Sequence, residues 1–186
     1  MKDLVHRATT GPRRGWTVAA LFVLTVLVGL ICMPSLADMA DRGVDIVPYE
    51  LARTSERAAE LNARLGPDGR RSARITLVLD YAFLVAYGLF AAAACLVIAA
   101  RCAERGRPRL ARLGPVFAIG GLVAALCDAI ENAALLRIAG GNVDQPGPLI
   151  AFTFASAKFA LLAAALAYGV VALASTVGRP VADPAT

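Results

Sequence analysis

The chain has 186 residues, of which 58% are hydrophobic and 18% charged, and it carries a formal net charge of +5. Soluble domains are roughly 45–50% apolar and about 25% charged, so this chain is too apolar for an ordinary soluble domain. Its apolar residues are mostly alanine, leucine and valine in long runs, and only four cysteines are present. These features exclude a disordered chain, a collagen, a coiled coil and a disulfide-stapled secreted scaffold. We therefore expect a single membrane domain over residues 1–186.

Four apolar segments are long enough to cross the roughly 30 Å hydrocarbon core of a bilayer as helices, which takes roughly 20 residues. In chain order they are residues 15–36, 75–100, 113–136 and 148–177. Backbone amides that face lipid must be paired within their own segment, so each segment is predicted to be an α-helix. The sequence thus predicts an all-α fold, a bundle of four transmembrane helices.

The connection between the first two spans contains a short helical pattern over residues 54–65. Thr54 is a favourable N-cap, and Gly66 with Pro67 supplies a stop. Apolar residues recur between them at helical spacing, at Ala58, Leu61 and Leu65. We predict a short extracytoplasmic amphipathic helix here. Such a pattern fits both a connector on the membrane surface and a lid over a site.

Lysine and arginine residues indicate the orientation, because they are enriched in cytoplasmic segments. The N-terminal segment carries Lys2, Arg7, Arg13 and Arg14, and the second connection carries Arg101, Arg105, Arg107, Arg109 and Arg112. We therefore predict a multi-pass protein of the plasma (inner) membrane with both termini in the cytoplasm. The basic excess suits contact with anionic membrane lipids, and without interleaved aromatic residues it predicts no nucleic-acid partner.

The N-terminal segment also fits a second interpretation. Arg13 and Arg14 precede an apolar run, and Ser35-Leu36-Ala37 resembles a small-x-small cleavage site of a signal peptide. Cleavage would leave three spans. The run is long for a signal peptide, which favours a retained anchor.

The cysteines and the single histidine give no sign of a metal or cofactor site. Cys32, Cys95, Cys102 and Cys127 form no Cys-x-x-Cys motif, so we expect them to be buried by packing. His6 is the only histidine, which excludes a histidine-based triad within the spans. Gly120 and Gly121 are expected to allow close contact between helices.

The third span contains the most informative residues, Asp128, Glu131 and Asn132, which helical spacing places on one face. Counted at about 1.5 Å per residue, Lys158 on the fourth span reaches a similar depth, and Asp80 on the second lies a turn or two higher. A charge near the bilayer centre costs roughly 2.5–3.5 kcal/mol, so these groups are expected to meet in one polar site.

Three carboxyl groups face one ammonium group in this predicted site, so full pairing of ionised groups is impossible. Either one carboxyl holds a proton or a cation occupies the site. The structural alternative is a network in which Lys158 pairs with Asp128 or Glu131 and only fixes the helix register. We expect four neighbouring polar residues to line the same cavity: Tyr81, Tyr87, Thr153 and Ser156.

Four short motifs resemble those of a family of uncharacterised small four-helix bacterial integral membrane proteins. The motifs are Leu51-Ala-Arg-Thr54 with Glu56-Arg57, Leu79-Asp-Tyr81 with Phe83 and Tyr87, Asp128-Ala-Ile-Glu-Asn132 with Leu135 and Leu136, and Ala157-Lys-Phe159. They extend over about residues 49–168. The resemblance implies a four-helix membrane protein in which Asp80, Asp128, Glu131, Asn132 and Lys158 act as one set, and it implies no activity.

A looser similarity, in architecture alone, is to four-helix membrane proteins of the sterol-isomerase and sigma-2 type. In those proteins intramembrane carboxylates hold cationic ligands, so the similarity implies a ligand class and no more.

Three functions remain open from the sequence. The first is binding of a proton, a cation or a small cationic amphiphile at the polar site, without a cofactor or metal. The second is an intramembrane enzyme that modifies a lipid or isoprenoid, with one carboxyl as acid and another as base. The third is an accessory or scaffold subunit, as a homo-oligomer or with a membrane partner protein.

Overall fold

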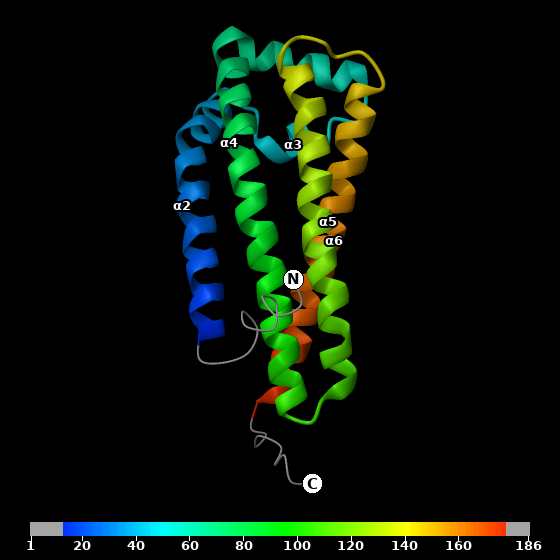
Figure 1. Ribbon diagram of the computed structural model, residues 1–186. Helices are drawn as coiled ribbons and strands as arrows, with labels where there is room; N and C mark the ends of the chain where they lie inside the picture. The colour runs from blue at the N-terminus through cyan, green and yellow to red at the C-terminus, as the bar shows by residue number, and fades with distance from the viewer. Residues whose placement is uncertain (1–12, 178–186) are drawn as a thin grey trace.

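The computed structural model describes residues 13–177 and contains five helices (Figure 1). They are α2 (Arg13–Asp41), α3 (Ile46–Glu50), α4 (Ser55–Glu104), α5 (Pro108–Ala139) and α6 (Gly147–Thr176). No strand occurs among these residues, which confirms the predicted all-α class. Four of the helices are long and apolar enough to cross a membrane. His6 lies outside the described residues.

The four long helices run side by side along one axis (Figure 1). Helix α4 packs against α2 and α5, and α5 packs against α6, whereas α2 has little contact with α5 or α6. We call the end of the bundle that carries α3 and the α5–α6 connection the α3 end. The opposite end carries the connection between α4 and α5. Helix α2 therefore stands on one flank of the bundle, held mainly by α4.

Three of the predicted spans lie within these helices, which extend further than predicted, and the fourth, 148–177, runs one residue past the end of α6 at Thr176. Helix α2 continues to Asp41, α4 includes the segment before residue 75, and α5 is longer at both ends. The predicted limits depended on where charged and polar residues begin. A helix can contain charged and polar residues where it lies outside the hydrocarbon region. The helices therefore continue beyond the ends of their apolar segments.

The predicted amphipathic helix forms the first part of α4. Thr54 is its N-cap and accepts a hydrogen bond from the Arg57 amide at 3.2 Å. The helix is interrupted at Gly66, whose φ of 64° is a left-handed conformation that glycine adopts most easily. Pro67 then begins the long part of α4 in a new direction, so the first part lies across the α3 end of the bundle (Figure 1).

This first part of α4 is packed onto the bundle, which favours the lid interpretation over a solvated connector. Its predicted apolar stripe is fully buried, with Ala58, Leu61 and Leu65 each at most 1% exposed. Asn62 bridges two elements, because its amide donates to the Ile138 carbonyl at 2.5 Å and its Oδ1 accepts from the Tyr49 hydroxyl at 2.8 Å. We refer to α3 together with Ser55–Leu65 as the cap.

Helices α4 and α5 approach closely where small residues face one another. A Cβ atom on Gly88 would lie 2.8 Å from the Ala125 Cβ, and one on Gly121 would lie 2.9 Å from the Ala91 Cβ. The expectation of close contact is therefore confirmed for Gly121. It is wrong for Gly120, where the nearest atom to such a Cβ is 4.0 Å away, because that residue lies on another face of the helix.

Candidate binding site at the cap

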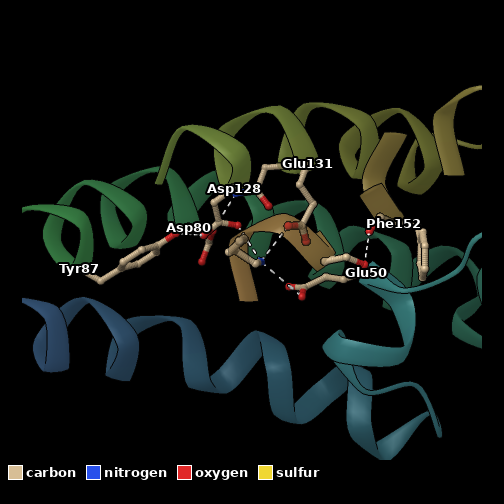
Figure 2. A network of polar contacts seen from close by, with 9 residues as sticks. Glu50, Asp80, Tyr87, Asp128, Glu131 and Phe152 are labelled. Carbon is tan, nitrogen blue, oxygen red and sulfur yellow. Dashed lines mark hydrogen bonds and ion pairs between the residues drawn. The ribbon is translucent and has the colours of Figure 1, made fainter. Parts of the chain in front are cut away.

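Lys158 on α6 lies at the centre of a buried polar network. Its Nζ atom is 2.9 Å from Asp128 Oδ1, 2.9 Å from Glu131 Oε2 and 3.4 Å from Glu50 Oε2. Figure 2 shows the carboxyl groups of Asp128 and Glu131 on one side of the network and that of Glu50 on the other. The network thus joins α3, α5 and α6 through one ammonium group.

Helix geometry explains why these groups meet inside the bundle. Asp128 and Glu131 are three residues apart on α5 and point the same way, and they are 3% and 0% exposed. Lys158 follows Gly147, the first residue of α6, by 11 residues, which is about 16 Å along the helix axis. Its buried aliphatic stem brings the ammonium group to the α5 carboxylates.

A second set of contacts adds α4 to the network. The Asn132 amide donates to Asp80 Oδ2 at 2.7 Å, and the Tyr87 hydroxyl donates to Asp128 Oδ2 at 2.8 Å. Both oxygens of Asp128 are therefore engaged, one by Lys158 and one by Tyr87. We call Glu50, Asp80, Asp128 and Glu131, together with Lys158, the carboxylate cluster.

Six of the seven site residues predicted from the sequence are joined in this network: Asp80, Tyr87, Asp128, Glu131, Asn132 and Lys158. Tyr81 is placed differently. Its side chain is 36% exposed, and its hydroxyl donates to the Ala129 carbonyl at 3.1 Å. It braces α4 against α5 outside the network.

Thr153 and Ser156 were expected to line the cavity, and that expectation is wrong. Both residues are exposed. Their hydroxyls donate to carbonyls of the preceding helical turn, Thr153 to Leu149 at 2.7 Å and Ser156 to Phe152 at 2.7 Å. Such bonds satisfy a hydroxyl on the apolar surface of a helix without any tertiary partner.

Glu50 is the network residue that sequence reasoning missed, since the connection between the first two spans was predicted as a surface connector or a lid and none of its residues was assigned to the polar site. The available signal was the apolar pattern around it. Val44, Tyr49 and Ala52 are at most 2% exposed, and they anchor α3 against the bundle so that Glu50 points inward. Apolar residues on both sides of Glu50 in the sequence could have indicated that this acid lies on a packed segment.

The electrostatics of the cluster are unbalanced. Three carboxyl groups lie within ion-pair distance of one ammonium group, a fourth, that of Asp80, accepts from Asn132, and the side chain of Glu50 is only 13% exposed. Burial raises the pKa of Glu50 to about 7, while the positive charge of Lys158 acts in the opposite direction. Glu131 Oε2 is paired with Lys158 at 2.9 Å, whereas Glu131 Oε1 has no hydrogen-bond partner among the described residues.

A cavity of about 960 Å³ begins at this cluster and runs along the bundle between α2, α4 and α6. Its polar wall, near the cap, is formed by Glu50, Thr76, Asp80, Tyr87, Asp128 and Lys158. The remaining walls are apolar or aromatic, and they include Phe83, Phe90, Leu162 and Leu166. The cavity is thus polar at one end and apolar along its length.

Thr76 is the one hydroxyl group of the polar wall that lacks a partner among the described residues. It is 4% exposed, and its Oγ1 accepts and donates no hydrogen bond there. A buried hydroxyl without a partner loses the hydrogen bonds that water would have provided. Thr76 therefore offers an unused donor and acceptor to whatever occupies the polar end of the cavity.

All four cysteines are free and buried, as their lack of metal-site spacing predicts. Cys32 and Cys95 line the cavity. Among residues 13–177, no three histidine, cysteine, aspartate or glutamate side chains are arranged to hold a metal ion. The cluster is therefore a set of carboxylates around an internal ammonium group.

Comparison of the chain with protein-family models, with curated proteins and with solved structures found no significant match.

Proposed function

We propose that this chain is an integral membrane protein that binds a cationic amphiphile at the carboxylate cluster. The observation that carries the proposal is that three carboxyl groups lie within ion-pair distance of one ammonium group, and that Asp80 lines the same buried site next to a large apolar cavity. Buried charges are costly unless they are paired, and Lys158 alone cannot pair every carboxyl group. A ligand cation would supply the missing positive charge.

The walls of the cavity favour an organic cation over a bare inorganic ion. Hard cations such as calcium and magnesium take six or more oxygen ligands, whereas most of the wall here is hydrocarbon. Aromatic rings line the cavity close to the charged groups, and the Lys158 ammonium already lies 4.8 Å from the centroid of Phe159. Rings in this position attract cations through their electron-rich faces.

The distribution of arginine supports an orientation in the membrane. Arg101, Arg105, Arg107, Arg109 and Arg112 surround the connection between α4 and α5. By the positive-inside rule, this end of the bundle would face the cytoplasm. The cap and the carboxylate cluster would then lie toward the outer face of a plasma membrane.

A ligand pair that differs only in charge tests the proposal. Purified protein in nanodiscs of zwitterionic phosphatidylcholine is titrated with dodecylamine and, separately, with dodecanol, and thermal unfolding is followed. A ligand that binds the folded state raises the unfolding temperature. We expect dodecylamine to raise it and dodecanol to leave it unchanged, because only the amine carries the charge that the cluster lacks.

The double variant Asp128→Asn with Glu131→Gln identifies the cluster as the site. It should lose the response to dodecylamine, because it removes two negative charges and preserves side-chain size. The control is Glu60→Gln with Asp144→Asn, which removes the same charge at exposed positions. Equal responses to both ligands in the parent, or an undiminished amine response in the double variant, would overturn the proposal.

A further inference from the structure

We infer that the ligand is a single-chain amphiphile that lies lengthwise in the cavity, with its cationic head against the cap and its hydrocarbon tail between α2, α4 and α6. This inference rests on the proposed function and adds the shape and direction of the ligand. Three observations support it: the length of the apolar part of the cavity, the chemistry of its polar end, and the exposure of its open side.

The apolar part of the cavity is long enough for a whole lipid tail. On α6 the lining residues extend from Lys158 to Leu173, which is 15 residues or about 22 Å along the helix axis. One leaflet of a bilayer has a hydrocarbon thickness of about 15 Å, half of the roughly 30 Å core. A tail of ordinary length therefore fits between the cluster and the far end of the cavity.

The polar end fits an amine head group by charge and by hydrogen bonding. Glu50, Asp80 and Asp128 line this end and supply negative charge. Thr76 lines the same end, and its buried Oγ1 is without a partner among residues 13–177. An ammonium group of the ligand can donate to Thr76 and to a carboxylate at once. This gives the buried hydroxyl the hydrogen bond that the protein does not provide.

One long side of the cavity is open toward the surroundings of the bundle. Lining residues of α2 and α6 are also strongly exposed, with Leu30 and Met33 at 59% and 54% and Leu166 and Val170 at 70% and 60%. In a bilayer this opening faces lipid tails. A single hydrocarbon chain can therefore reach the cavity sideways from the bilayer.

A variant that fills the middle of the cavity tests whether the hydrocarbon tail of the ligand lies there. Ala165 lines the cavity on α6, seven residues or about 10 Å beyond Lys158. In Ala165→Leu the new side chain enters the path of a long tail and leaves the polar end unchanged. Ala167→Leu is the matched control, because Ala167 is exposed on the same helix and does not line the cavity.

Hexylamine and hexadecylamine are the probes, titrated into phosphatidylcholine nanodiscs and compared per mole of lipid. We expect Ala165→Leu to bind hexylamine as the parent does and to bind hexadecylamine about tenfold more weakly, a loss of about 1.4 kcal/mol, because the added side chain overpacks the path of the tail. Ala167→Leu should bind both amines normally. Retained hexylamine binding also shows that Ala165→Leu is folded.

Each remaining outcome identifies what has failed. Binding of both amines by Ala165→Leu with parental affinity, or equal weakening of both, would overturn the lengthwise placement of the tail. Equal weakening of hexadecylamine in Ala165→Leu and Ala167→Leu would do the same. If neither hexylamine nor hexadecylamine binds to the parent, the proposed function itself is overturned. Should Ala165→Leu fail to fold, Gly169→Leu provides a second obstruction, because a Cβ there has its nearest neighbour, Ile98, at 3.6 Å.

Discussion

Glu50 and Lys158 are 108 residues apart in the chain, yet Glu50 Oε2 lies 3.4 Å from Lys158 Nζ. This contact ties the cap to α6, and Figure 2 shows Glu50 entering the carboxylate cluster from α3. The same carboxyl group lines the cavity. Glu50 therefore has two roles: it holds the cap against α6, and it contributes to the charge of the site. Its ionisation should affect both the packing of the cap and the charge of the cluster.

Stability should depend on pH through Glu50. Burial raises its pKa from the ordinary value of 4.5 to about 7. Between these values the folded state binds more protons than the unfolded state, so the free energy of unfolding falls as the pH rises. The contribution is complete below about pH 4.5 and is lost above about pH 7. Thermal unfolding in detergent at a series of pH values measures it.

The variant Glu50→Gln isolates this contribution, because glutamine is neutral at every pH. Its stability should decline less steeply than that of the parent between pH 5 and pH 7. Lys158, Asp128, Glu131 and Asp80 face Glu50 from the neighbouring helices, so the predicted quantity is the difference between variant and parent. Glu60→Gln, at an exposed position, should keep the parental slope. Parallel curves for the parent and Glu50→Gln would contradict the prediction.

Removal of the central ammonium group should be strongly destabilising. Lys158→Met leaves several buried carboxyl groups without a counter-charge, and loss of one partner of a buried pair costs about 3–5 kcal/mol. Unfolding by a denaturing detergent measures the change. As a control, Arg64→Met removes one side of an exposed pair with Glu60, which is worth about 0–1 kcal/mol. Similar losses in the two variants would show that Lys158 is not needed for charge balance.

A triple variant separates a functional cluster from a structural one. Replacing Lys158 by Met and both Asp128 and Glu131 by Leu removes the ammonium group together with the two α5 carboxyl groups closest to it, and well-packed apolar replacements of this kind are often neutral or stabilising. We expect the triple variant to be more stable than Lys158→Met alone and to have lost its response to dodecylamine. Persistence of the amine response would assign binding to another part of the protein.

Most of the fold follows from the sequence, because long apolar segments have only one way to satisfy their backbone in lipid. The helical face shared by Asp128, Glu131 and Asn132 is likewise a matter of spacing on one helix. Glu50 could not be placed in this way. Its position depends on how Tyr49 and Asn62 pack the cap onto the Ile138 carbonyl, and a contact across 76 residues leaves no periodic signal.

The exposed polar residues Thr153, Ser156 and Tyr81 show a second limit of sequence-based prediction, because they were assigned to a site that they do not line. Thr153 and Ser156 lie close to Lys158 in sequence, but a helix turns by about 100° per residue and carries them to other faces. Tyr81 is next to Asp80 and points away for the same reason. Proximity along a helix therefore predicted the depth of these residues and not the face they occupy.

Close packing of α4 on α5 should be sensitive at Gly121. A leucine there would place its Cβ 2.9 Å from the Ala91 Cβ and would force the helices apart. Overpacking of this kind costs about 1–3 kcal/mol, and here it would also shift Asp128 and Asn132 relative to α4. Gly120→Leu is the control, since that position has space. Gly121→Leu should lower the unfolding temperature and weaken the dodecylamine response, and equal behaviour of the two variants would contradict the packing argument.

The cap should depend on the hydroxyl group of Tyr49. This side chain is 1% exposed, and its hydroxyl donates to Asn62 Oδ1 at 2.8 Å while the Asn62 amide holds the Ile138 carbonyl. Tyr49→Phe leaves the Asn62 oxygen buried without a donor, which costs about 1–3 kcal/mol. Tyr81→Phe removes a hydroxyl from an exposed side chain and should cost less. Thermal unfolding of both variants gives the comparison.

The same variant tests whether the cap positions Glu50. Tyr49 immediately precedes Glu50, so a loosened cap should weaken the contact between Glu50 and Lys158. We expect Tyr49→Phe to accelerate amide hydrogen exchange in residues 46–65 and to reduce the affinity for dodecylamine, with little change in the exchange of the long part of α4. If exchange rises along all of α4, Tyr49 supports the whole bundle. If affinity is unchanged while the cap exchanges faster, Glu50 takes no part in holding the ligand.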